Sequence, residues 1–312
     1  MVFKPLPLLR LPCLVHLEIL GHWNLTEQYR FAKLSKRSAC VVKKITRRQR
    51  YFLTVTFDDV PYFYLKRIGE KEETEEFKWK KVYELDEFTG TRITQADVTR
   101  QIVNAIIIYA DVFNMPTVQM RIVKESPAIL TALRIVNCLG MKLFHTAIEL
   151  DDSSAEVYAR LIHLFKNTPR VTLYSETPLE IPDEWYPVFR CDVVRLYSED
   201  GFTVEHLMNH FMDCKKVHVR YGDFTVEEMR PLLQKWIRGE SRMETLILIS
   251  SRQAIPYETL LAEIPAVRVH GARPKSPNKL FTEGYIVTMH NGKNAFVGSH
   301  LDCFVMTTDF QL

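Results

Sequence analysis

Apolar residues near the start of the chain recur at a helical spacing that ends at a glycine. Leu11, Val15 and Ile19 fall on one side of a helix with about 3.6 residues per turn, and Gly21 supplies a stop. Pro12 suits the first turn, because a helix leaves the N–H of that position without an intrahelical partner. The pattern therefore predicts a short helix that begins near Pro12.

Two more short helices are predicted before residue 48. Thr26 can cap the second helix, whose inward side carries Tyr29 and Leu34, and a third runs from about Lys36 to Lys44. A unit of this size has more apolar side chains than it can bury alone, so we expect it to complete its core elsewhere. Its partner is either the rest of the fold, as for an N-terminal cap, or another protein.

Alternating aromatic, aliphatic and threonine residues predict β-structure in the following stretch. Strands are expected at 50–57, 62–65 and 77–83, and Pro61 and the acidic run 70–76 separate them as turns. A helix is expected from Thr94 to Asn114. Residues 49–115 are therefore predicted to form a small antiparallel sheet plus a helix.

Short β-branched runs recur through the remainder of the chain, with amphipathic segments between several of them. The spacings between equivalent positions are 25, 23, 23, 27 and 23, for Ile148, Leu173, Leu196, Val219, Leu246 and Val269. Two of the intervening helices open with capping-box sequences, at 153–156 and 225–228. Repeats of this length are typical of stacked βα units similar to leucine-rich repeats, although the consensus is absent and we class them as irregular. An ordinary α/β domain with a chance spacing is the alternative.

The C-terminal residues 281–297 predict a hairpin, in which Asn291-Gly292 is the signal for a type I′ turn. The whole pattern predicts a chain of class α+β or α/β. Its expected parts are a helical unit at 1–48, a small antiparallel sheet plus helix at 49–115, and a repeat-like region ending in the hairpin at 116–312.

The N-terminal helical unit resembles an F-box, the adaptor-binding module of cullin-RING ubiquitin ligase receptors. The likeness lies in Pro7-Leu-Leu-Arg-Leu-Pro12, in the apolar face Val15, Ile19 and Leu20, and in Leu34-Ser-Lys-Arg37 before the last helix. In particular it is similar to nematode F-box proteins that carry an F-box-associated domain of the second type. The C-terminal hairpin has a weaker likeness to the end of that family.

This resemblance implies a non-catalytic substrate receptor of a Skp-cullin-F-box ubiquitin ligase. The F-box would bind a Skp-family adaptor, and through it a cullin and a RING protein, while the C-terminal region would bind an unknown protein substrate. No cofactor is implied. The adaptor-binding residues that the resemblance implies are Leu8, Leu11, Pro12, Val15, Ile19, Leu20, Tyr29 and Leu34.

Composition agrees with an intracellular protein. The chain has 312 residues and a formal net charge of +3, and no apolar run reaches the length of a membrane span. Prolines interrupt the N-terminal apolar run, which argues against a signal peptide. The six cysteines are scattered without a CxxC pair, which indicates reduced, mostly buried thiols. We therefore expect a cytoplasmic or nuclear location.

Catalytic and metal-binding motifs are weak. The sequence has no G-x-S-x-G, P-loop, G-x-G-x-x-G or H-E-x-x-H motif. The best metal candidate is His206, His210 and Cys214, with His218 nearby, but three positions over two helical turns span about 12 Å. We expect a packed helix face there and no metal.

Two other functions remain open from the sequence. Nine basic residues and no acidic one lie between Arg30 and Arg50, next to Tyr51 and Phe52, so this segment is also compatible with binding nucleic acid. The repeat-like region alone is compatible with a protein-binding scaffold that has no ligase role.

Overall fold

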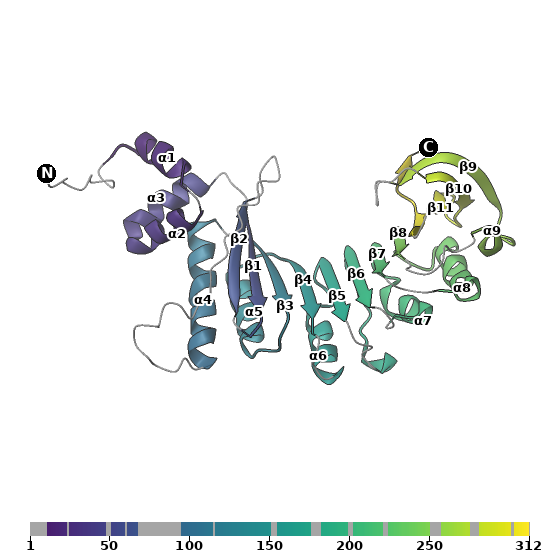
Figure 1. Ribbon diagram of the computed structural model, residues 1–312, viewed down its shortest axis with the longest axis horizontal. Helices are drawn as coiled ribbons and strands as arrows, with labels where there is room; N and C mark the ends of the chain where they lie inside the picture. Colours follow the sequence, from purple (N-terminus) through teal and green to yellow (C-terminus); the bar gives the residue numbers. More distant parts are fainter. Residues whose placement is uncertain are drawn as a thin grey trace. The chain divides into compact units, whose positions relative to one another are not determined.

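In the computed structural model the chain folds into two compact units, Met1–Phe144 and His145–Leu312 (Figure 1). Described residues are 11–23, 25–47, 51–59, 61–67, 95–114, 116–150, 155–175, 182–198, 202–220, 224–249, 257–274, 281–300 and 303–311. Helices and largely parallel strands alternate along much of the chain. The protein is therefore of mixed α/β class, as predicted.

Three short helices open the first unit, followed by three strands, one long helix and one further short helix. The elements are α1 (Cys13–Gly21), α2 (Leu25–Leu34), α3 (Lys36–Thr46), β1 (Tyr51–Phe57), β2 (Tyr62–Arg67), α4 (Gln95–Val112), β3 (Thr117–Ile122) and α5 (Ala128–Cys138). The backbone N–H of Ser38 donates to Ser35 Oγ at 3.1 Å, which caps α3. Thr46, at the end of α3, donates from Oγ1 to the carbonyl of Val112 at 2.8 Å, and so joins α3 to the end of α4.

The sheet of the first unit is mixed rather than antiparallel. Strands β1 and β2 pair antiparallel, with Thr56 opposite Tyr62, as predicted. The other edge of β1 pairs parallel with β3, so that Phe57 lies opposite Ile122. Helix α4 lies between β1 and β3 in the sequence, and a crossover of this length permits parallel pairing. The strand expected at 77–83 lies outside the described residues.

The second unit continues with strands that alternate with helices or turns. Its elements are β4 (Leu143–Glu149), α6 (Ala155–Phe165), β5 (Arg170–Ser175), η3 (Asp183–Trp185), β6 (Val193–Ser198), α7 (Val204–His206), η4 (Leu207–Phe211), β7 (Lys216–Arg220), α8 (Val226–Ile237), β8 (Thr245–Ile249), α9 (Tyr257–Leu260), β9 (Ala266–Pro274), β10 (Phe281–Thr288), β11 (Asn294–His300), β12 (Cys303–Thr307) and β13 (Phe310–Gln311). Strands β4 to β8 pair parallel in sequence order. The β4 strand begins at the end of the first unit.

The parallel register matches the predicted repeat through four strands and then departs from it. Ile148 lies opposite Leu173, Leu173 opposite Leu196, and Leu196 opposite Val219. Val219 pairs with Leu248, so the predicted match with Leu246 is wrong by two residues. A shift of two residues keeps the apolar side chains on the same face of the sheet, so burial alone does not distinguish the two registers.

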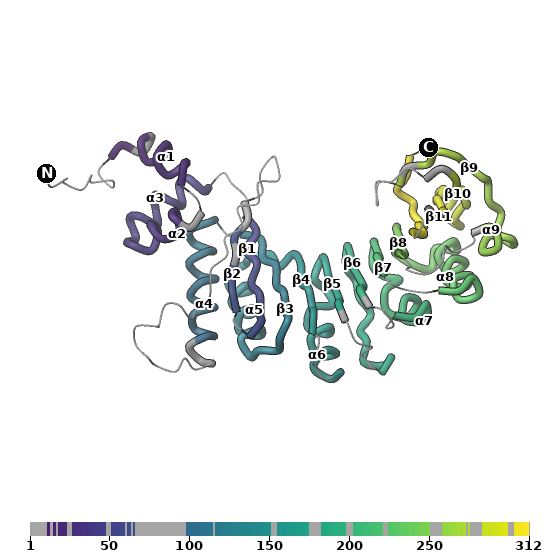
Figure 2. The backbone as a smooth tube through the Cα atoms, viewed as in Figure 1, coloured from purple at the N-terminus to yellow at the C-terminus, as the bar shows by residue number. Residues whose placement is uncertain are grey.

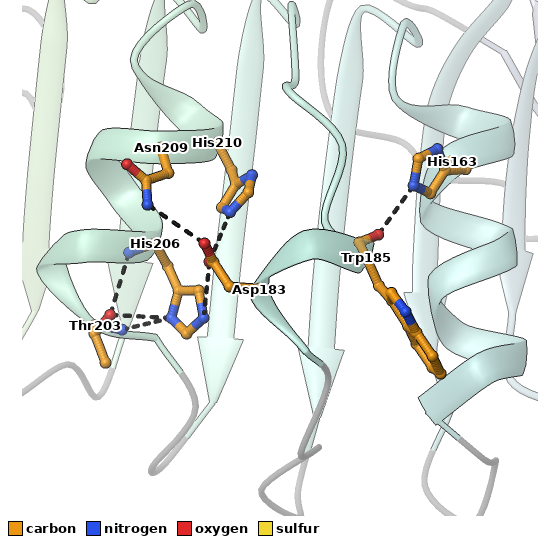
Figure 3. A network of polar contacts seen from close by, with 7 residues as sticks. All are labelled: His163, Asp183, Trp185, Thr203, His206, Asn209 and His210. Atoms are coloured by element: carbon orange, nitrogen blue, oxygen red, sulfur yellow. Dashed lines mark hydrogen bonds and ion pairs between the residues drawn. The ribbon is translucent and has the colours of Figure 1, made fainter.

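Helices of the second unit cover one face of these strands. Figures 1 and 3 show α6, η3 and α7 on the same side of the sheet. Side chains that face them, such as Leu173, Leu196 and Val219, are at most 2% exposed. On α8, Trp236 is fully buried, and its indole N–H donates to the carbonyl of Met243 at 2.7 Å. The main core of the unit therefore lies between the helices and this face.

The parallel series ends at β8. Beyond it the strand order is β8-β12-β11-β10-β9-β13, and each of these pairs is antiparallel. Figure 2 follows the backbone from β8 through α9 into these strands. The prediction that the run around Val269 is a further repeat is wrong, because β9 pairs with β10 while β12 occupies the free edge of β8.

The C-terminal hairpin is confirmed, but its turn differs from the predicted one. Strands β10 and β11 pair antiparallel, with Thr288 opposite Asn294. A type I′ turn needs positive φ at both central residues, whereas here Gly292 has a φ of 78° and Asn291 is not in that region. The N–H of Gly292 donates to the carbonyl of Met289 at 2.9 Å. The longer loop therefore uses one left-handed glycine.

Candidate functional site

Helix α1 is fixed to the first unit by one face. It begins after Pro12, whose carbonyl accepts from the N–H groups of Val15 and His16 at 3.0 and 3.1 Å. His16 and Leu20, one turn apart, are 6% and 0% exposed. The side-chain amide of Gln28, which is itself buried, donates to the carbonyl of Leu20 at 3.1 Å. These contacts hold the end of α1 against the start of α2.

A neighbouring face of α1 presents apolar side chains to solvent. Val15 is 37% exposed, and Leu11 and Ile19, one turn before and after it, are partly exposed. Pro12 is exposed as well, and Leu34 at the end of α2 is 75% exposed. We call Leu11, Pro12, Val15, Ile19 and Leu34 the apolar helical surface. They are five of the eight residues expected to bind an adaptor.

Two more of those eight residues lie inside the unit. Leu20 is fully buried, and Tyr29 is 4% exposed and stacks on Tyr109 of α4 with ring centroids 4.9 Å apart. Burial raises the pKa of the Tyr29 hydroxyl to about 12. In this arrangement the two side chains hold the helices in place and do not reach a partner. The eighth residue, Leu8, lies outside the described residues.

The basic segment that suggested nucleic-acid binding is exposed, but one of the two aromatic residues expected to stack on bases is buried. Its described cations are all on the surface: Arg30, Lys33, Lys36, Arg37, Lys43, Lys44 and Arg47. Lys43 forms an ion pair of 2.6 Å with Asp111. Tyr51 is only 2% exposed and packs edge-on against Phe113, with ring centroids 5.2 Å apart, while Phe52 stacks on Phe144. Tyr51 is therefore not available for stacking on a base.

The two histidines expected on one helix face do lie together, and a residue that the sequence did not suggest joins them. Figure 3 shows His206 and His210 pointing at Asp183 of η3. The Asp183 carboxylate accepts from His210 Nε2 at 2.8 Å and from Asn209 Nδ2 at 3.4 Å, and lies 3.6 Å from His206 Nε2. The hydrogen bond from His210 lowers the pKa of Asp183. Thr203 caps α7 and bonds to His206 through its hydroxyl at 3.1 Å.

Cys214, the third member of the expected metal candidate, lies elsewhere. Its thiol is fully buried and donates to the carbonyl of Phe189 at 3.5 Å. It lies beyond the π-helical turn η4 (Leu207–Phe211), which itself carries His210. Among the described residues, no group of three His, Cys, Asp or Glu side chains is arranged to hold a metal ion. The cluster around Asp183 therefore connects η3 to α7 and η4.

The cysteines differ in burial between the two units. Of the five cysteines whose side chains are described, none of them in a disulfide, Cys191, Cys214 and Cys303 are buried, whereas Cys40 and Cys138 are exposed. The expectation of mostly buried thiols thus holds for the second unit, which contains all three buried cysteines, and not for the two described in the first unit. A hydrogen bond with Cys214, together with burial, raises the pKa of the Cys191 thiol, which disfavours the nucleophilic thiolate.

Among the helices described, none is both long enough and apolar enough to cross a membrane. Comparison of the chain with protein-family models, with curated proteins and with solved structures finds no match in any of the three.

Proposed function

We propose that this chain is the substrate-recognition subunit of a Skp-cullin-F-box ubiquitin ligase. The apolar helical surface carries the proposal, because it lies in the segment whose residues resemble an F-box. Helix α1 contains a single charged residue, Glu18, which pairs with His22 at 3.6 Å. A helix so apolar is normally buried on more than one side, and an adaptor would cover its exposed face.

In the proposal, the second unit binds the target. Its parallel strands resemble stacked repeats in one further respect, the hydrogen bonds that join one repeat to the next. The thiols of Cys191 and Cys214 each donate to a backbone carbonyl located 25 residues earlier, that of Lys166 and of Phe189 respectively. Equivalent bonds at equal offsets are typical of repeat architectures, in which each unit contacts its neighbours. Such a sheet offers a broad surface for a protein target.

In this proposal the chain performs no chemistry itself. It would hold a target near a ubiquitin-conjugating enzyme, which raises the effective concentration of the target lysine. The apolar helical surface would fix one end of this assembly.

Co-purification with a Skp-family adaptor tests the proposal. Because Val15 and Leu34 are exposed, Val15→Asp and Leu34→Asp are expected to leave the fold intact. Burying a side chain of this size contributes about 1.5–3 kcal/mol, so the double variant is expected to bind the adaptor at least about 100-fold more weakly. Leu130→Asp is the matched control, because Leu130 on α5 is also apolar and 50% exposed.

The proposal fails if the wild type does not co-purify with any Skp-family adaptor. It also fails if the double variant and Leu130→Asp co-purify equally well. Retention of binding to a target protein without an adaptor would then indicate the repeat-type scaffold.

A further inference from the structure

The second unit has a sheet face that the helices leave uncovered. Side chains alternate along a strand, so the neighbours of buried Leu173, Leu196 and Val219 point to the opposite face. The parallel register places Thr172, Arg195 and His218 in one row across β5, β6 and β7 on that face. The residues two positions before these three form a second row on the same face, and the residues two positions after them form a third.

Cations dominate this face. Arg170, Arg195, Lys216 and Arg220 lie on it, and Glu149 of β4 is the carboxylate among the in-register positions of β4 to β7. We call these four cations the basic sheet face. In the part of the chain that the structure describes, no hydrogen bond or ion pair joins the side chain of Arg195 or Lys216 to another residue. Such charges are available to an anionic ligand.

Two neutral histidines stand beside Arg195. His145 Nε2 lies 2.9 Å from the hydroxyl of Thr172, and His218 Nε2 is buried without a hydrogen-bond partner among the described residues. Burial and the nearby guanidinium of Arg195 lower the pKa of both imidazoles to about 4. The histidines are therefore uncharged at neutral pH, chiefly because of their burial and in second place because the Arg195 cation lies close to them.

Aromatic residues lie within the basic sheet face, and apolar residues end it at β8. Tyr174 and Tyr197 lie in register in the row of Arg220, with ring centroids 6.1 Å apart. On β8 the next in-register position after His218 is Ile247, which is 2% exposed and packs in a cluster with Phe296. The cationic area therefore ends where the C-terminal strands cover the sheet.

We propose that the basic sheet face binds an acidic, extended peptide segment. Adjacent strands are about 4.8 Å apart, so the four strands β4 to β7 span about 14 Å, the length of about four or five extended residues. Arginine pairs with carboxylates through two parallel N–H groups, and the tyrosines offer ring faces to the residues between them. That this segment belongs to the ubiquitylation target rests on the function proposed above.

An acidic peptide fits the face better than nucleic acid does. The chain has a sequence pI of about 8.4 and a net charge of only +3, whereas nucleic-acid-binding domains are usually more basic. Two uncharged imidazoles and the Glu149 carboxylate also interrupt the cations, which suits spaced carboxylates more than a continuous phosphate backbone.

Fluorescence anisotropy of the full chain with a labelled peptide of alternating glutamate and glycine tests this inference. We expect binding that weakens with salt and is absent for the peptide with glutamine at every glutamate position. Arg195→Glu and Lys216→Glu are each expected to weaken binding by at least about tenfold, and the neutral Arg195→Gln by a smaller factor. Lys293→Glu on the β10–β11 turn makes the same change in net charge and is expected to alter affinity less than about twofold.

Equal affinity of Arg195→Glu and Lys293→Glu for the glutamate peptide would overturn the inference. Tighter binding of a single-stranded DNA oligonucleotide than of the peptide, lost in Arg195→Glu, would overturn it in favour of nucleic acid. The peptide assay contains no adaptor, so its failure leaves the proposed ligase role intact. Conversely, loss of adaptor binding leaves the peptide result unchanged.

Discussion

Acidification is expected to destabilise the second unit, because it contains His145 and His218 as neutral imidazoles. Their pKa is lowered from 6.5 to about 4 in the folded chain, mainly by burial and by Arg195. In the unfolded chain both imidazoles bind a proton near pH 6.5. Between these two pH values the unfolded state holds more protons, so the free energy of unfolding decreases as the pH falls through that window. Above pH 6.5 these groups have little effect on stability.

The size of the effect follows from the difference in pKa. At about pH 5 the imidazole is protonated in the unfolded chain and neutral in the folded one, which corresponds to about 2 kcal/mol for each histidine. Both side chains are only partly removed from solvent, so we expect about 1–2 kcal/mol from each. The two together should lower the free energy of unfolding by about 2–4 kcal/mol between about pH 7 and pH 5.

Urea unfolding of the wild type and of the His145→Gln, His218→Gln double variant measures this difference. Glutamine keeps a polar side chain of similar size but does not titrate, so the variant should lose about 2–4 kcal/mol less than the wild type on acidification. Carboxylates elsewhere in the chain contribute equally to both proteins. An equal loss of stability in the two proteins would refute the reasoning, and so would a loss confined to pH values below 4.

Two further predictions concern packing and helix capping. A Cβ at Gly298 would lie 2.5 Å from the buried ring of Phe296, so Gly298→Ala is expected to lower the free energy of unfolding by about 1–3 kcal/mol. Gly21→Ala, whose Cβ meets nothing within 4 Å, serves as the control, and equal denaturation midpoints for both variants would contradict this packing. Thr225→Ala removes the side-chain cap of α8 and should cost about 1 kcal/mol in urea unfolding. Thr225→Ser should restore the stability, and failure to do so would argue against the cap.

The sequence predicted the parallel part of the fold because the apolar alternation there is local. The spacing of Ile148, Leu173, Leu196 and Val219 predicts both the positions of the strands and their pairing register. In the structure these four residues lie opposite one another on adjacent strands. The pairing of β12 with β8 could not be predicted in this way. The choice of a neighbour for a strand edge depends on packing between distant segments, and local propensity does not encode it.

Local sequence patterns are equally limited in predicting which side chains of the candidate surfaces are accessible. The helical stripe puts both Tyr29 and Leu34 on the inward side of the second helix, but only Tyr29, which stacks on Tyr109 of α4, is buried, whereas Leu34 is 75% exposed. The resemblance to an F-box implies an interface position for both, and the structure leaves only Leu34 accessible. The basic sheet face could not be predicted from the sequence for a related reason. Arg170, Arg195 and Lys216 are separated by more than 20 residues along the chain, and only the parallel register brings them together.

The position of β12 also bears on synthesis of the chain. Strand β8 ends at Ile249 and its edge partner β12 begins at Cys303, so 53 residues (250–302) are made between the two. At about 5–20 residues per second this takes about 3–10 s, during which the N–H and C=O groups along one edge of β8 are unpaired. An open edge of this kind pairs readily with other chains. A premature stop shortly after β8 would therefore be expected to yield aggregated protein, even though every residue of the parallel strands is present.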